Sequence, residues 1–319
     1  MPILKFILRR LGLGALTLFV VSLLIFLVTQ AFPSDPAQAI LGRETTPESL
    51  DALRQELGLY RPAIEQFSDW LFGILRGDFG KSFVTQMQIS EYIAARVGNS
   101  LFLMVVGAFF SIPLSIGVGA YSALKRDKKF DTVSSTTSLI LAAIPEFVMG
   151  TALIMLLSTS VFHLLPAITL IDAGEAPWAD LGGIVLPVLT LVLAVTPYVS
   201  RTMRASMIEI LESDYVEMAR LKGMSERVVL LRHGLPNALG PVFQVIALNL
   251  AYLAGGTVIV ERLFNFPGIG SALADSVRAR DLPVIQFLTL MIAGVYVLMN
   301  LVADVATVLA TPRLRTSLK

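Results

Sequence analysis

The chain has 319 residues, of which 55% are hydrophobic and 15% are charged, and its mean hydropathy is +0.74. These proportions lie well outside the average of soluble proteins and predict a membrane protein. The formal net charge of +1 argues against a nucleic-acid partner, and the lack of cysteine excludes disulfides, thiolate zinc sites and cysteine nucleophiles. Two histidines, His163 and His233, are too few and too far apart in sequence to suggest a His-rich metal site, and no residue pattern indicates an enzyme.

The first apolar segment, residues 11–34, is uncharged and follows Lys5, Arg9 and Arg10. A secretory signal peptide also begins with basic residues, but its apolar core is only about 7–15 residues long. This segment is long enough to cross a hydrocarbon layer about 30 Å thick. We therefore predict a retained span, with residues 1–32 forming the N-terminus and the first transmembrane helix.

The only long polar segment, residues 33–96, is predicted to form a small extracytoplasmic helical domain. Pro47 opens a helix that ends near Gly58, and a second helix runs from Pro62 to Leu75. The sequence GDFGKS, which follows at positions 77 to 82, is similar to part of a phosphate-binding loop. A P-loop needs a glycine five positions before the second glycine of this sequence, and Leu75 stands there instead.

The second span is predicted over residues 97–124. Small residues recur in it every four positions, so one face can approach the backbone of a neighbouring helix closely. These residues are Ser111, Ser115, Gly119 and Ala123. Four cations follow within five residues, from Lys125 to Lys129. A nucleic-acid or lipid patch is one interpretation of them, and the basic flank of a cytoplasmic loop is the simpler one.

A carboxylate interrupts the predicted third span, residues 132–160, at Pro145-Glu146. With Thr132 at the membrane surface, 14 residues at roughly 1.5 Å each place Glu146 about 21 Å deep. A carboxylate at this depth should face the bundle interior or a water-filled cavity. Glu146 is therefore a candidate for the translocation cavity, where it would contact an amino group of a cargo. The alternative is a structural pairing with a group of a partner subunit or with a trapped water molecule.

Three more spans bring the predicted total to six, in an all-α integral membrane protein. They cover residues 181–200, with Pro187 and Pro197 as expected kinks, then residues 240–260 and finally residues 282–310. The loop before the fourth span, residues 162–180, holds three acidic residues and no Lys or Arg. Spans two to six form a predicted core over residues 97–319, which contains the charged loop 201–238.

Residues 214–237 form the longest charged interval between two apolar segments in the second half of the chain. We predict two short helices in this interval. Asp214 caps the first, with Glu217 completing a pair like that of a capping box. Gly223 is expected to end this helix in a left-handed conformation.

The second helix is predicted to have Ser225 as its N-cap, and Gly234 and Pro236 are expected to end it. A compact charged hairpin between two membrane spans should project from the membrane face. It is therefore expected to meet a soluble partner.

The hairpin resembles the EAA loop of bacterial ABC importer permeases, in which a Glu-Ala-Ala start is followed by a glycine and later by Leu-Pro. Five residues of this chain match that pattern: Glu217, Ala219, Gly223, Leu235 and Pro236. The chain departs from it at position 218, a methionine here, and at position 233, a histidine. In that family the loop is a coupling helix that docks in a cleft of the ATPase subunit. The resemblance assigns this role to Asp214, Tyr215, Glu217, Ala219, Arg220, Gly223, Leu235 and Pro236.

Other stretches are similar to permeases of the dipeptide, oligopeptide and nickel class. Residues 57–62 are similar to an LGLxRP stretch, and residues 77–82 to a GDxGxS stretch, of the outer domain. An outer-loop motif, ExxFxxPGxG, is matched by Glu261, Phe264, Pro267, Gly268 and Gly270. The family often ends in Asp-Pro-Arg, and here Thr311 replaces that aspartate before Pro312 and Arg313.

The resemblance implies a permease subunit that moves a peptide by alternating access and is driven by a separate ATPase. Its implied partners are a second, homologous permease, two ATPase subunits, an extracytoplasmic binding protein and membrane lipids. ATP and magnesium would bind to the ATPase subunits, and this chain would hold no cofactor and no metal. A nickel chelate, glutathione or an opine-like solute is an alternative cargo.

The distribution of Lys and Arg predicts the orientation of the spans. With the N-terminus inside, 16 of the 25 cations fall in cytoplasmic segments and 9 in outer ones. Positive residues favour the cytoplasmic side, and most strongly so in short loops. We therefore expect both termini and the hairpin in the cytoplasm, in a multi-pass protein of the bacterial inner membrane.

Two rival classes remain at this point. A secondary transporter would couple transport to ions through residues inside the membrane, and Glu146 and Asp304 are the candidates for that role. A channel would also be embedded in the membrane, but it would have no need of a hairpin that matches an ATPase dock.

Overall fold

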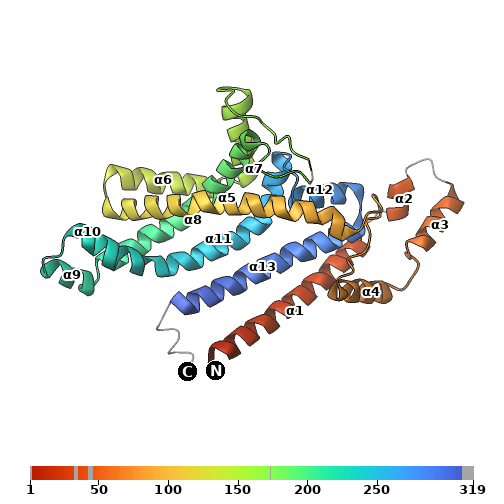
Figure 1. The fold of residues 1–319 in the computed structure, drawn as a ribbon, viewed down its shortest axis with the longest axis horizontal. Coiled ribbons are helices and arrows are strands. Elements are labelled where there is room, and N and C mark those ends of the chain that lie inside the picture. Colours follow the sequence, from red (N-terminus) through yellow and green to blue (C-terminus); the bar gives the residue numbers. More distant parts are fainter. Residues whose placement is uncertain (1, 32–34, 42–45, 173, 311–319) are drawn as a thin grey trace.

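A computed structural model describes residues 2–31, 35–41, 46–172 and 174–310 (Figure 1). The expected C-terminal Thr311-Pro-Arg sequence and the last three cations lie outside these residues. Within them, regular structure is helical apart from one isolated bridge between Lys81 and Gln88. The α-helices are α1 (Pro2–Gln30), α2 (Pro36–Leu41), α3 (Pro47–Glu56), α4 (Ala63–Arg76), α5 (Ile89–Leu124), α6 (Lys129–Ala143), α7 (Glu146–Ile154), α8 (Leu181–Leu211), α9 (Asp214–Leu221), α10 (Glu226–Val228), α11 (Leu235–Leu263), α12 (Ile269–Ala279) and α13 (Leu282–Ala310). Two wider π-helical segments are η1 (Met155–Thr159) and η2 (Val229–Gly234).

Among the described residues, five helices are long and apolar enough to cross a membrane: α1, α5, α8, the stretch Glu226–Leu253 and α13. A sixth span is present only if α6 and α7–η1, which are bent by 105° against each other, count as one. The bend falls where Pro145 was expected to interrupt the span. Because proline disfavours a helical conformation in the residue before it, Ile144 is extended, with φ −89° and ψ 125°.

Several helices are longer than the apolar segments that identified them. Lys5, Arg9 and Arg10 lie inside α1, α5 begins eight residues before the expected start of the second span, at Ile89, and α8 continues to Leu211. Hydropathy measures the part of a helix that lies in hydrocarbon, whereas the backbone hydrogen bonds of a helix continue into water. At these ends the helices therefore extend beyond the predicted spans.

The molecule is elongated, and different helices lie at its two ends. In Figure 1, α9 and α10 lie at one end of the longest axis, and α2 and α3 lie at the other. We refer to these as the α9 end and the α3 end. The expected helices after Pro47 and Pro62 are present as α3 and α4, and Gly77 ends α4 with φ +83°.

The GDFGKS stretch packs onto the start of α13 at the α3 end. The Ser82 hydroxyl and the Phe83 backbone N–H both donate to the carboxylate of Asp281, which is buried. Asp281 directly precedes α13, so this contact joins the polar segment before α5 to the last helix of the chain. The stretch thus has a structural role here.

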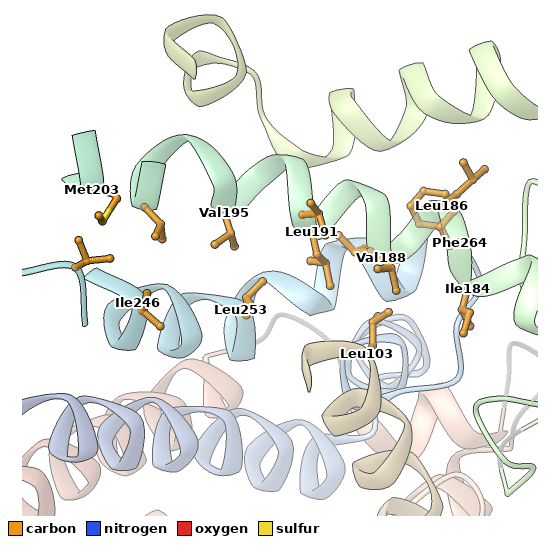
Figure 2. Packing of buried hydrophobic residues seen from close by; sticks show 14 of the residues in the cluster. Leu103, Ile184, Leu186, Val188, Leu191, Val195, Met203, Ile246, Leu253 and Phe264 are labelled. Atoms are coloured by element: carbon orange, nitrogen blue, oxygen red, sulfur yellow. The ribbon is translucent and has the colours of Figure 1, made fainter. Parts of the chain in front are cut away.

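The main apolar core lies along α8, which is covered by α5, α7 and α11. Figure 2 shows Leu191 and Val195 of α8 pointing toward α11, where Leu253 and Ile246 lie, and Leu103 contributing from α5. Asp180 caps α8: its carboxylate accepts from the N–H groups of Leu170 and Gly183 at 3.0 and 2.9 Å. Those backbone hydrogen bonds hold the pKa of Asp180 below its usual value.

The small-residue face predicted on the second span is the surface by which α5 meets α8. Ser111, Ser115, Gly119 and Ala123 are all buried. A Cβ at Gly119 would lie 2.4 Å from the backbone oxygen of Ser200 and 2.7 Å from Cβ of Met203. Only glycine permits this approach of the two helix backbones.

Replacing Gly119 with valine should therefore force α5 and α8 apart. We expect a loss of roughly 1–3 kcal/mol, as for overpacked cores, seen as a lower thermal unfolding midpoint of the purified protein. Gly117→Val is the matched control, because it puts the same β-branched side chain in the same helix and a Cβ at Gly117 meets no atom within 4 Å. Equal midpoints for the two variants would contradict this packing.

Candidate coupling surface and translocation site

Helix α9 begins at Asp214, one residue earlier than predicted, because Asp214 was expected to be the N-cap that precedes the helix. Ser213 is the N-cap, in an extended conformation, and Asp214 is already the first helical residue. The expected capping pair of Asp214 and Glu217 is therefore wrong. Because α8 continues to Leu211, only two residues remain in which the chain can turn into α9, and the turn falls on Ser213.

The predicted left-handed glycine at the end of α9 is confirmed. Gly223 has φ +78°. Its N–H donates to the carbonyl of Arg220 at 2.9 Å, and the N–H of Met224 donates to the carbonyl of Ala219 at 3.3 Å. These two hydrogen bonds form a Schellman motif, which satisfies carbonyls that a helix end otherwise leaves free.

The second predicted helix does not end at Gly234 and Pro236. Helix α10 passes into η2 and then directly into α11, with Pro236 in the first turn of α11. Pro236 has no N–H for the α-helical ladder, and the wider π turn just before it lets the chain continue without that hydrogen bond. Ser225 has the extended conformation of an N-cap, but its side chain makes no capping hydrogen bond.

A small cluster fixes α9 against the helix that follows. Val216 and Ala219 are buried against Val229 of η2. The Arg220 guanidinium donates to Glu226 at 2.8 Å, and the Tyr215 hydroxyl donates to the backbone oxygen of residue 233 at 3.3 Å. Helix α9 is thereby tied to the base of α11.

The opposite side of α9 points away from the protein. Leu221 is 74% exposed and Met218 is 52% exposed, and Glu217 is exposed beside them. Of the other predicted coupling residues, Asp214, Tyr215, Arg220, Gly223 and Pro236 are exposed, Leu235 is half-buried and Ala219 is buried. We define Glu217, Met218 and Leu221 as the coupling face, a candidate surface for a partner. Met218 and Leu221 were not among the predicted coupling residues, although apolar residues three apart in a charged helix were a signal.

The outer-loop motif forms a closed hydrogen-bond network around one buried carboxylate. Glu261, at the end of α11, is fully buried and accepts from the hydroxyl of Ser100 at 2.6 Å. It also accepts from the backbone N–H groups of Gly270 and Ser271, at 2.7 and 3.3 Å, in the first turn of α12. A carboxylate at a helix N-terminus satisfies free N–H groups and is favoured by the helix dipole.

The two glycines of this motif allow the Glu261 carboxylate to lie against the backbone at the start of α12. A Cβ at Gly268 would lie 2.3 Å from the Glu261 carboxyl group, and one at Gly270 would lie 2.2 Å from Cα of Val258. The backbone oxygen of Pro267 accepts from the amide of Asn99 at 3.0 Å. Phe264 is fully buried in the main core. All five motif residues therefore help to join α5, α11 and α12.

Two charged pairs that the sequence did not reveal join other helices. Asp131 of α6 is buried and accepts two hydrogen bonds from Arg204 of α8, at 2.5 and 2.7 Å. The Ser122 hydroxyl of α5 donates to the same carboxylate at 2.6 Å. Between α1 and α13, Arg10 pairs with Asp304 at 3.1 Å, so this candidate for ion coupling has a cationic partner.

Glu146 differs from these paired carboxylates. It is the first residue of α7, directly after the bend, and only 9% of it is exposed. Its Oε1 atom has no hydrogen-bond partner among the described residues, and the Tyr252 side chain of α11 interacts with the carboxyl group. The group lines a cavity of about 270 Å³ together with Tyr198, Tyr252, Ala194 and residues 141–145.

Comparison with known families matches most of this chain. Residues 111–316 match the family described as "Binding-protein-dependent transport system inner membrane component". Residues 3–104 match the family described as "Binding-prot-dependent transport system membrane comp, N-term". The chain therefore belongs to the inner-membrane permease family of ABC importers. It is a multi-pass protein of the inner membrane and a component of a transport system.

Individual relatives extend over almost the whole length. The chain is 36% identical to the glutathione transport system permease protein GsiC of Escherichia coli (strain K12), over 98% of this chain and 99% of that protein. It is 35% identical to the probable peptide ABC transporter permease protein y4tP of Sinorhizobium fredii, over 97% and 99%. A crystal structure of an amino acid ABC transporter with histidines shares 16% identity, with a TM-score of 0.47, over 71% of this chain and 94% of that one.

Removing the buried carboxylate of Glu261 should destabilise the protein. Glu261→Ala leaves the Ser100 hydroxyl and two backbone N–H groups without their acceptor, and each unsatisfied buried group costs about 1–3 kcal/mol. We expect a total loss of roughly 3 kcal/mol, measured as a lower thermal unfolding midpoint. Arg262→Ala is the control next to it: Arg262 pairs with Asp275 at a partly exposed site, and such pairs contribute about 0–1 kcal/mol. A larger loss for Arg262→Ala would contradict the network's role.

Proposed function

We propose that this permease moves peptides or peptide-like solutes such as glutathione into the cell by alternating access. The similarity to permeases named for glutathione and peptide transport, over nearly the whole chain, supports this cargo class. The single observation that carries it within the structure is the Glu146 carboxylate, which lines a cavity and has no cationic partner among the described residues. Peptides bear a free amino group, which is the complementary charge.

The orientation that we propose puts the α9 end in the cytoplasm and the α3 end outside. It follows from the 16 cations assigned to cytoplasmic segments against 9 outside. Both termini are then cytoplasmic, and residues 33–96 form an extracytoplasmic domain. The core, residues 97–319, carries the coupling loop 201–238 on the side where ATP is available.

The proposed assembly contains a second homologous permease, two ATPase subunits and an extracytoplasmic binding protein. The exposed coupling face supports an ATPase partner, because two apolar side chains and a carboxylate project from a helix that is fixed on its other side. ATP and magnesium act on the ATPase subunits, and this chain supplies no cofactor site. Nucleotide changes the conformation only by binding one state more tightly than the other.

Motion of the ATPase reaches the spans through two rigid connections. The cluster of Val216, Ala219 and Val229 ties α9 to η2, and η2 continues into α11 without a break. Helix α11 carries Tyr252 to the Glu146 cavity. A displacement of α9 therefore moves one wall of the proposed cargo site.

An ion-coupled secondary transporter is the less favoured class. Its two candidate residues were Glu146 and Asp304, and Asp304 pairs with Arg10. The classes are separated by uptake into vesicles that hold the assembled complex, where ATP without an ion gradient should suffice. Uptake driven by an ion gradient without ATP would refute the proposed function.

Coupling should depend on the left-handed conformation of Gly223. A β-branched residue there costs roughly 1–2 kcal/mol from the backbone alone, since a Cβ at Gly223 meets no atom within 4 Å. We expect Gly223→Val complexes to assemble but to lose most cargo-stimulated ATP hydrolysis and uptake. Gly223→Asn is the matched control, because asparagine tolerates this conformation.

Glu217→Lys, a charge reversal on the coupling face, should lose coupling in the same way. Full stimulation of the Val and Lys complexes would refute the coupling assignment.

Glu146→Gln tests the cargo site, because it keeps the side-chain shape and removes the charge. A hydrogen bond to a charged group contributes about 1.5–3 kcal/mol. Uptake of a peptide with a free amino group should therefore fall about tenfold or more, with assembly and basal ATP hydrolysis kept. Uptake of the same peptide with an acetylated amino group is the control and should change little. Unchanged uptake together with a lower unfolding midpoint would place Glu146 in the scaffold instead.

A further inference from the structure

Helix α4 has two apolar faces, and the protein covers only one of them. Phe67 and Trp70 pack against Phe26 of α1, with ring centroids 5.3 and 6.4 Å from that of Phe26. On the other apolar face, Ile64, Phe72 and Leu75 are 72%, 56% and 73% exposed. No described residue of this chain buries those three side chains.

The three exposed residues form one stripe on α4. Ile64 and Leu75 are eleven residues apart, which is about three helical turns, so they lie on the same side, with Phe72 beside Leu75. Glu65, Asp69 and Arg76 follow on the next part of the helix surface and are exposed. A helix with a broad apolar arc and a charged remainder is typical of helices that lie at a membrane surface.

The position of α4 relative to α1 gives its height along the membrane normal. Gln30, the last residue of α1, donates from its side chain to Gln66 of α4 at 3.0 Å. Phe19 and Phe26, farther back in α1, both contact Phe67. These contacts place α4 level with the last turns of α1 (Figure 1). Helix α1 is a candidate membrane span, so α4 lies beside the end of that span. It does not stand clear of the membrane on the α3 side.

The turns of α1 that α4 contacts also carry exposed apolar side chains. In the same turns of α1, Leu23, Leu24 and Leu27 are exposed, and only 11% of the apolar window of α1 is buried. Apolar side chains at this height face acyl chains unless another protein covers them. A charged flank beside the apolar stripe marks where the helix surface returns to headgroups and water.

We propose that α4 is an interfacial helix whose residues Ile64, Phe72 and Leu75 insert among the lipid acyl chains around the end of α1. The charged residues of α4 then remain at the level of the headgroups. The helix anchors the polar segment between α1 and α5 to the membrane surface. This segment is consequently held at a fixed height over the mouth of the bundle at the α3 end.

The test uses single cysteines in this cysteine-free chain, within the complete transporter reconstituted in lipid nanodiscs. A nitroxide spin label is attached at Phe72→Cys, at Leu75→Cys and, as the control on the charged side, at Asp69→Cys. Oxygen concentrates in hydrocarbon, and a nickel chelate stays in water. We expect labels at positions 72 and 75 to be relaxed several-fold more by oxygen than by the chelate. The label at position 69 should show the reverse preference.

Two outcomes would overturn the proposal. Strong relaxation by the chelate at positions 72 and 75 would mean that the stripe faces water. Protection from both reagents would mean that a protein covers it, either the second permease or the binding protein. A second measurement changes a neighbouring side chain while the label stays in place: Leu75→Asp should shift the label at Phe72→Cys toward the chelate, whereas Arg76→Asp should leave it unchanged.

Discussion

Hydrocarbon offers no hydrogen bonds, so each polar group in the interior of this bundle needs a partner within the protein. Glu261 meets the requirement through Ser100 and two backbone N–H groups of α12, and Asp131 meets it through Arg204 and Ser122. Each carboxylate joins helices that are far apart in sequence. A buried carboxylate fixes geometry more strictly than apolar packing does, because its hydrogen bonds have preferred distances and directions. The relative positions of α5, α6, α8, α11 and α12 depend on these few groups.

Glu146 is informative because it breaks the same rule. Its carboxyl lies at a bend in the chain, beside a cavity, and one of its oxygens has no partner in the part of the chain that the structure describes. Stability alone favours replacing such a group with an apolar one, since an unpaired buried charge is costly. A site that must hold and release a charged group in turn has the opposite need: its partner has to be absent in one state. The bend at Pro145 supplies the opening, because it interrupts the helix and exposes the first turn of α7 to the cavity.

Sequence patterns over a few neighbouring residues predicted conformations that depend on those neighbours alone. They did not predict helix ends and contacts that depend on distant parts of the chain. Gly223 was predicted to be left-handed from its place after an amphipathic turn, and it is. The cap at Asp214 was wrong because it depends on where α8 ends, which hydropathy does not record. The stop at Pro236 was wrong because a π turn accommodates proline without ending the helix. The pairing of Asp131 with Arg204 spans 73 positions, and nothing in the spacing of single residues indicates it. The conformation of Gly223 was thus identifiable from the sequence, whereas the ends of the two helices and the ties between helices were not.

The error at Pro236 changes how the coupling loop should be understood. A hairpin of two helices ending in a flexible joint would absorb much of any displacement of α9, because loops with few contacts deform at low cost. The continuous path from α10 through η2 to α11 removes that joint. On the α8 side, two residues, Glu212 and Ser213, lie between α8 and α9. The loop therefore packs against both helices: Ile210 and Leu211 of α8 contact the cluster of Val216, Ala219 and Val229, and Arg220 of α9 donates to the backbone oxygen of Leu211 at 3.3 Å. Tyr198 on α8 and Tyr252 on α11 both line the Glu146 cavity. The coupling face is thus joined, through the end of α8 and through η2 and α11, to both helices that supply a tyrosine to this cavity.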